Sequence, residues 1–256
     1  MNWQPSPSRM AQAPFTCRAL RQGSSHDTFR DWDLFAMISV GGCPLFASVI
    51  VEVSQQSITG FILVGGASRR MGYDKGKLLL SGKSFVEHIA GALSPIVTSV
   101  SVVGNEFKGC EIRIDSVPDL YQKWGALGGV HAALEACQTA WAAVVACDLP
   151  FISTDLFRML ADRRGAFDAV APIQNDGIPQ PLCALYKKSG CLGRATQLID
   201  SGERRPIALL QSVRTCWVEF SEIANLEGSC NFFDNINTQE DYKSAREKGA
   251  VIRSRD

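Results

Sequence analysis

A glycine turn followed by a cluster of cations is the feature of this sequence that points most directly to chemistry. The turn is Gly65-Gly66, and it comes after an apolar run that ends at Val64. Glycine lets the backbone approach a ligand closely and direct its N–H groups at anionic oxygens. The cations that follow are Arg69, Arg70 and Lys75. Because guanidinium and ammonium groups beside such a turn suit phosphate, the sequence predicts chemistry on a nucleotide.

The glycine turn differs from two widespread phosphate-binding sequences. It lacks the G-x-G-x-x-G pattern of dinucleotide-binding proteins, and it lacks the G-K-[ST] ending of a P-loop. Glycines after a strand often do no more than turn the chain. The cations of residues 69–75 make the pattern specific, with Lys77 as the alternative to Lys75 for contact with the phosphates.

From residue 58 onward, short apolar runs alternate with amphipathic segments of helical length. The sequence predicts strands at 58–64, 97–103, 111–115, 141–146, 169–172, 182–186 and 215–219. It predicts helices at 84–93, 128–136, 154–163, 192–201 and 206–211, and a last helix from Gln239 with Thr238 as its N-cap. Helices between apolar strands imply right-handed crossovers. We therefore expect an α/β fold with a single Rossmann-like, doubly wound, mostly parallel sheet and helices on both faces.

Polar residues follow several of these predicted strands. In a doubly wound sheet, ligands bind outside the carboxyl ends of the strands, so these residues should converge on one cleft. They are Gly65-Gly66, Gly104-Asn105, Asp119, Asp148 and Asn235-Ile236-Asn237.

Asp148 is the candidate metal ligand because it lies just beyond the apolar run that ends at Ala146. Its alternative role is to cap a helix, but Ser153 and Thr154 are better placed to cap the next one. Magnesium takes one or two carboxylates together with phosphate oxygens and water, so a single Asp suffices. For Asp119 and Asn105 the alternative role is to shape a turn.

The motifs together resemble a known family, the molybdenum cofactor guanylyltransferases, within the wider group of nucleotidyltransferases. The resemblance covers about residues 58–248 and runs in the family's order. It is carried by Leu63-Val64-Gly65-Gly66-x-Ser68-x-Arg70-Met71-Gly72-x-Asp74-Lys75, Val117-Pro118-Asp119, Gly125-Ala126-Leu127-Gly128-Gly129, Ala146-Cys147-Asp148-Leu149-Pro150 and Asn235-Ile236-Asn237-Thr238-Gln239-Glu240-Asp241.

The resemblance implies a nucleotidyltransferase fold and a role for each matching residue. Nucleotide binding would involve the backbone of Leu63, Val64, Gly65 and Gly66, with Asn105 and Asp119 holding the nucleoside. Lys75 would reach the phosphates, with Arg70 beside them, and Asp148 would bind Mg²⁺. Asn235 and Asn237 would complete the reaction centre.

Two positions depart from the family's pattern. The family usually has Gly-Pro-Leu-Ala-Gly where this chain has Gly125-Ala126-Leu127-Gly128-Gly129. The lost proline should loosen this loop, although its small residues still allow close approach. Gln239 stands where proline is usual, which should alter only the start of the last helix.

The resemblance implies transfer of GMP from GTP to the terminal phosphate of molybdopterin or its molybdenum-loaded form, with release of pyrophosphate. Mg²⁺ would be the cofactor, and molybdoenzymes or their chaperones would be candidate protein partners. Two alternatives stay open: a related transferase that uses CTP or another phosphate acceptor, and a nucleotide-binding module without catalysis. The latter should lack the metal carboxylate or the lysine, whereas this chain has Asp148 and Lys75.

Composition narrows the class of protein. The net charge is zero, which argues against general attraction to nucleic acid. Nine scattered cysteines without a C-x-x-C pair favour free thiols in a reducing cytoplasm, and three histidines show no zinc-ligand spacing. No apolar run reaches the length of a membrane span. Residues 1–57, rich in Ser, Pro, Gln and Arg at their start, predict a disordered or loosely packed extension before a transferase domain at 58–256.

Overall fold

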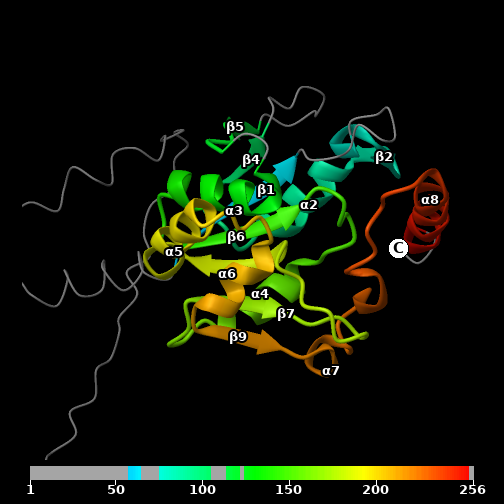
Figure 1. The fold of residues 1–256 in the computed structure, drawn as a ribbon. Coiled ribbons are helices and arrows are strands. Elements are labelled where there is room, and N and C mark those ends of the chain that lie inside the picture. The colour runs from blue at the N-terminus through cyan, green and yellow to red at the C-terminus, as the bar shows by residue number, and fades with distance from the viewer. Residues whose placement is uncertain (1–56, 65–74, 105–113, 122–123, 254–256) are drawn as a thin grey trace, which may run out of the picture. The chain divides into compact units, whose positions relative to one another are not determined.

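Seven strands make up the central sheet of the part of the chain that the structure, a computed structural model, describes: residues 57–64, 75–104, 114–121 and 124–253. They are β1 (Ile58–Val64), β4 (Val100–Gly104), β5 (Asp115–Val117), β6 (Trp141–Ala146), β7 (Ala169–Pro172), β8 (Cys183–Lys187) and β9 (Thr215–Val218). Their order across the sheet is β5-β4-β1-β6-β8-β7-β9 (Figure 1).

The sheet is mostly parallel. Strands β4 and β6 pair in parallel with the two edges of β1, and β5 pairs in parallel with β4. Strand β8 is antiparallel to both β6 and β7, while β9 is parallel to β7. Every strand of this sheet except β8 therefore points in one direction, and the predicted fold class is confirmed.

Helices cover both faces of the sheet. One face carries α2 (Phe85–Leu93), α4 (Thr154–Asp162) and the short α7 (Phe220–Ile223). The other carries α3 (Gly125–Ala136), α5 (Lys188–Asp200) and α6 (Pro206–Ser212). Successive side chains of β1 point to opposite faces of the sheet, so that Ile62 packs with the first set of helices and Phe61 with the second.

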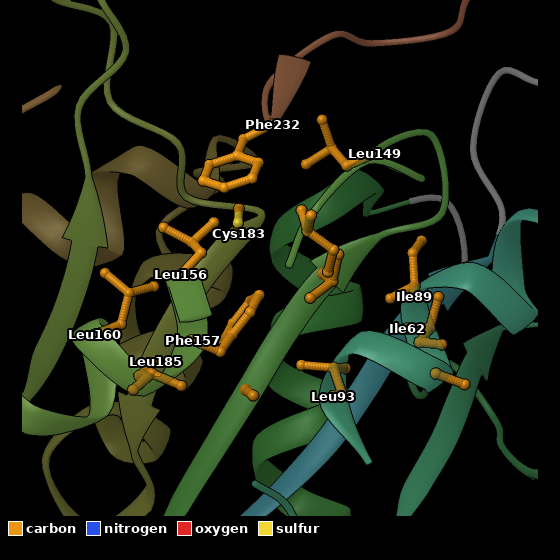
Figure 2. Close-up of a cluster of buried hydrophobic side chains, with 14 of the residues drawn as sticks. Ile62, Ile89, Leu93, Leu149, Leu156, Phe157, Leu160, Cys183, Leu185 and Phe232 are labelled. Atoms are coloured by element: carbon orange, nitrogen blue, oxygen red, sulfur yellow. The ribbon is translucent and has the colours of Figure 1, made fainter. Parts of the chain in front are cut away.

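Figure 2 shows the core on the first face. Ile62 of β1 lies near Ile89 and Leu93 of α2, and Leu156 and Phe157 of α4 lie on the same side of the sheet. Each of these side chains is fully buried. Burial of a side chain of this size stabilises the fold by about 1.5–3 kcal/mol, so this layer fixes the strands that carry the site.

A third cluster links the last helix to a hairpin that precedes α2. It joins the hairpin of β2 (Leu79–Leu80) and β3 (Lys83–Ser84) to α8 (Gln239–Arg253) through buried Leu80, Phe85, Ile236 and Ala245. The Tyr242 hydroxyl donates a hydrogen bond to the Leu79 carbonyl over 2.6 Å. Two 3-10 turns complete the described elements, η3 (Lys75–Lys77) and η4 (Ser229–Asn231).

Several predicted boundaries differ from the observed ones. Helices α3 and α5 begin earlier than predicted, at Gly125 and Lys188, and β4 begins later, at Val100. The hairpin of β2 and β3 and the helix α7 were not predicted. The predicted extension falls almost wholly on residues 1–56, outside the described part of the chain, and stays a prediction. No described helix is both long and apolar enough to cross a membrane.

Candidate active site

The carboxyl ends of four parallel strands line up at one edge of the sheet. Val64, the last residue of β1, pairs with Gly104, the last of β4, and Leu63 pairs with Ala146 at the end of β6. Val117 of β5 lies opposite Val103. The chain runs outward from β1 through β4 to β5 and then returns to the other side of β1 as β6. This reversal is the position at which open α/β sheets bind ligands.

Gly104 brings two of these strand ends unusually close. Its φ is +122°, and a Cβ atom added there would lie 2.0 Å from the Val64 carbonyl oxygen. Only glycine fits this conformation at this distance. The Val64 backbone, a predicted nucleotide contact, is therefore held against the end of β4.

The small residues at the start of α3 allow the same close approach from the second face. A Cβ on Gly129 would lie 3.3 Å from Cδ1 of Leu63, and one on Gly128 would lie 3.4 Å from Oδ1 of Asp119. The first turns of α3 thus lie beside both the end of β1 and the turn that contains Asp119. Two residues that the family resemblance assigns to the nucleotide meet at this helix.

Asp119 shapes the turn between β5 and α3. Its Oδ1 accepts a hydrogen bond from the Tyr121 backbone N–H over 3.0 Å, which is the turn-forming role that the sequence left open. Partial burial raises the pKa of this carboxyl, although the Tyr121 N–H and nearby His131 act in the opposite direction. The turn role and a nucleoside contact are compatible, because a carboxylate has two oxygens.

Asp148 lies immediately past the end of β6. The Cys147 N–H donates to the Leu63 carbonyl over 3.1 Å, so the ladder between β1 and β6 continues to the residue before Asp148. The side chain of Asp148 is half-buried. It does not cap α4, because the Leu156 N–H bonds to Ser153 Oγ over 3.2 Å.

Asn235 and Asn237 reach this edge through the backbone of the residue between them. The Ile236 N–H donates to the Asp148 carbonyl over 3.1 Å. Ile236 is buried in the cluster of α8 and the β2–β3 hairpin, while both asparagines are exposed. Leu78, just after η3, packs against the same cluster. The segments around 75–78, 148 and 235–237 are therefore neighbours.

The remaining predicted site residues fall outside the described part of the chain. These are Gly65, Gly66, Asn105 and Arg70. For Lys75 the backbone is described as the first residue of η3, and its side chain is not. The structure thus brings together Leu63, Val64, Asp119, Asp148 and the asparagine segment, and the roles of all these residues stay predictions.

Asp148 is the candidate at this edge to hold Mg²⁺. Among the described residues, no three His, Cys, Asp or Glu side chains gather into a metal-binding group. A single half-buried carboxylate beside a nucleotide is the protein share that Mg²⁺ usually takes, with phosphate oxygens and water completing its shell. Asp148 therefore fits the ion that the family resemblance implies.

Two features near the site were missed by the sequence analysis. His131 of α3 is buried, with Nε2 3.1 Å from Thr196 Oγ1 and its ring edge-on to Tyr121. Desolvation lowers its pKa, with Glu135, Asp119 and Asp200 opposing that shift. Its position on the apolar face of a predicted helix was the available signal.

The second feature is a tether at the start of α3. Trp124 Nε1 donates to the Glu203 carbonyl over 2.9 Å, and the Arg204 guanidinium lies 5.1 Å from the Trp124 ring centroid. Arg205 pairs with the Glu203 carboxylate at 2.7 Å. Trp124 thus fastens the loop before α6 to the helix that borders Leu63 and Asp119.

Comparisons with known proteins agree with this architecture. A probable molybdenum cofactor guanylyltransferase of Pelotomaculum thermopropionicum is 34% identical over 189 residues, which cover 73% of this chain and 91% of that protein. The molybdenum cofactor guanylyltransferase of Vibrio campbellii is 32% identical over 183 residues, covering 70% and 90%. The solved molybdopterin-guanine dinucleotide biosynthesis protein A of Archaeoglobus fulgidus superposes with a TM-score of 0.63 at 25% identity, covering 75% of this chain and 99% of that one.

The family assignment follows from a match along most of the described domain. The model of the MobA-like NTP transferase domain matches residues 60–215, which contain most of β1 together with Asp119 and Asp148. The chain belongs to the MobA-like NTP transferase family.

Proposed function

We propose that this protein transfers GMP from GTP to the terminal phosphate of molybdopterin or its molybdenum-loaded form and releases pyrophosphate. Support comes from the similar proteins named as molybdenum cofactor guanylyltransferases. The observation that carries the proposal is the meeting of Leu63, Asp119 and Asp148 at the edge where the strand order reverses. Nucleotides bind at such edges.

The reaction needs positioning more than covalent chemistry. The acceptor phosphate attacks the α-phosphorus in line, the bond to the β-phosphate oxygen breaks, and pyrophosphate leaves. The acceptor is already an anionic nucleophile, so no enzyme nucleophile is required. In this proposal the backbone at Leu63 and Val64 holds the nucleotide, and Asp119 binds the nucleoside.

Charge has to be neutralised as pyrophosphate forms. Mg²⁺, when bound, supplies positive charge to the phosphate oxygens, and Asp148 is the residue that would hold it. The sequence-based roles of Lys75 and Arg70 are to add charge on the leaving side. Asn235 and Asn237, exposed beside Asp148, would offer neutral ligands to the acceptor phosphate or the metal.

The test is a pyrophosphate assay with Mg²⁺, molybdopterin and each NTP in turn. We expect release with GTP and a guanine dinucleotide product. Turnover with CTP but not GTP would reassign the protein to cytidylyl transfer. Nucleotide binding without turnover under any of these conditions would support the non-catalytic module.

Replacing Asp148 by Ala tests the metal role. We expect kcat to fall on the order of 10³-fold, because the ion that stabilises the transition state loses its protein ligand. Asp155→Ala is the matched control, since this exposed carboxylate of α4 pairs only with Arg158 among the described residues. Both variants should melt within a few degrees of the original chain. Retained magnesium-dependent turnover in Asp148→Ala would remove this residue from the metal site.

The compartment and protein partners are parts of the same proposal. Cys137, Cys147, Cys183 and Cys191 are buried cysteines that form no disulfide, which suits the reducing cytoplasm. The product would pass from there to molybdoenzymes or their chaperones.

A further inference from the structure

Gln180 is a buried polar side chain at the base of the connection between β7 and β8. It is 9% exposed, which is low for an amide. Its side chain makes no hydrogen bond to any residue that the structure describes. The amide atoms are nevertheless not sealed from solvent, in contrast to the buried and unpartnered Nδ1 of His131. The stem of Gln180 is therefore packed while its amide stays reachable.

The backbone of Gln180 is fixed on both sides. Its N–H donates to the Pro172 carbonyl at the end of β7 over 2.9 Å. Its carbonyl accepts a hydrogen bond from the Cys183 N–H at the start of β8 over 3.2 Å. The side chain of Gln180 is buried and its backbone is hydrogen-bonded, so it has little conformational entropy left to lose. A ligand that forms hydrogen bonds with its amide would therefore bind at a small entropic cost.

Gln180 lies at the same edge of the sheet as Asp148. The Ala146 N–H donates to the Leu182 carbonyl over 2.9 Å, which continues the pairing of β6 with β8 past the last strand pair. Asp148 comes two residues after Ala146, and Gln180 comes two residues before Leu182. Both residues therefore lie beyond the carboxyl end of β6, with Gln180 on the β8 side.

This side of β6 is opposite to the side that carries the nucleotide candidates. Leu63, Val64 and Asp119 belong to β1 and the turn before α3, across β6 from β8. The in-line displacement sets the acceptor opposite the leaving pyrophosphate and does not by itself fix its position relative to the nucleoside. With the nucleoside over β1 and β4, as in the proposed function, the β8 side is the part of this edge that is left to the acceptor.

We propose that Gln180 is a specificity-determining residue that binds the cyclic amide edge of the acceptor's pterin ring, an inference that rests on the proposed function. A carboxamide has one acceptor and two donors, and it matches an adjacent C=O and ring N–H through two hydrogen bonds. Guanine presents the same edge, so the ligand chemistry has two sources. The position of Gln180 on the β8 side assigns it to the acceptor.

The test compares Gln180→Met with Gln138→Met in the full chain. Methionine keeps the length of the stem and removes both hydrogen-bonding groups. Gln138 is exposed just before β6, at the opposite end of that strand, and is the matched control. Steady-state pyrophosphate release is measured while molybdopterin and GTP are varied in turn. We expect the KM for molybdopterin to rise about tenfold in Gln180→Met, the equivalent of two lost hydrogen bonds. The KM for GTP and the melting temperature should stay close to those of Gln138→Met.

Three results would overturn the inference. A selective rise in the KM for GTP would assign the amide to guanine instead. Equal values of both constants in the two variants would show that neither substrate touches it. A large fall in melting temperature with uniform loss of activity would make Gln180 a packing residue. Failure of the proposed function is seen separately, as absence of pyrophosphate release from the unsubstituted chain with GTP and molybdopterin.

Discussion

Replacing Gly104 by Ala tests whether the end of β4 sets the position of the nucleotide edge. The substitution adds one methyl group at a residue whose φ is +122°. That methyl group would lie 2.0 Å from the Val64 carbonyl oxygen, whereas real contacts of this kind do not fall below 3.0 Å. One of the two strand ends therefore has to move by about 1 Å to restore contact distance.

The expected loss of stability in Gly104→Ala has two parts, and substitutions at other glycines allow them to be measured separately. A side chain in a sparsely populated backbone conformation costs about 1–3 kcal/mol, and forced overpacking adds about 1–3 kcal/mol. Gly177 has φ +82° with nothing within 4 Å, so Gly177→Ala carries only the first cost. Gly91 lies in α2 with open space around it, and Gly91→Ala should stabilise the protein by about 0.5–1 kcal/mol.

Urea unfolding of the three variants gives the free energies to compare. We expect Gly104→Ala to be less stable than Gly177→Ala by about 1–3 kcal/mol, or by about 2–10 °C in melting temperature for a domain of this size. GTP binding should weaken in Gly104→Ala only, because the displaced Val64 backbone is a predicted nucleotide contact. Equal unfolding midpoints for the two variants would refute the reasoning, since they would show that the ends of β1 and β4 move apart without a loss of unfolding free energy.

Two further predictions concern the helix α3. Because burial lowers the pKa of His131 in the folded protein, the unfolded chain binds a proton more readily, and stability should fall as the pH drops below about 6.5. In His131→Gln the difference in unfolding free energy between pH 7.5 and 5.5 should shrink, and an unchanged difference would exclude this histidine as its source. Trp124→Phe removes the hydrogen bond to the Glu203 carbonyl and keeps a ring beneath Arg204, so we expect a loss of about 1 kcal/mol in urea unfolding. Trp217→Phe on β9 is the control, because no hydrogen bond from its indole is described, and an equal loss there would contradict the assignment.

Three strands of the sheet could be predicted from the sequence to the residue. β1, β6 and β7 have the bounds that their apolar runs indicated. Nearly every residue of these strands is buried, since helices cover both faces of the sheet. A strand that is buried on both faces has a continuous run of apolar residues in the sequence, and the limits of that run predict the ends of the strand.

Helix starts could be predicted where the sequence carries a start signal, which is a capping side chain or, at α6, a proline in the first turn. Ser84 and Ser153 cap α2 and α4, and both starts were predicted to within one residue. Trp124 and Lys187 precede α3 and α5 without a side-chain capping bond. The sequence carries no start signal at these two helices, and their predicted starts were three or four residues late.

The reversal of β8 was the main topological feature that the pattern of elements left open. Alternating apolar and polar segments do not record the direction of a strand. The signal available was the connection itself, because residues 173–182 between β7 and β8 contain no helix. A parallel return needs a crossover that usually includes a helix, whereas a short connection of this kind favours antiparallel pairing. This reversal also places Gln180 at the ligand edge of the sheet.

The placement of the candidate site residues depends on backbone contacts that side-chain patterns do not encode. Asn235 and Asn237 were identified by resemblance, but their position is fixed by the Ile236 N–H bonded to the Asp148 carbonyl. Ile236 in turn packs with α8 and the β2–β3 hairpin, which follows the segment around Lys75. Packing of the last helix therefore positions both the asparagines and the start of that hairpin relative to Asp148. Residues of α8 are far in sequence from the predicted nucleotide contacts. Because they help to position these segments, their substitution should for this reason change turnover even where they touch no substrate.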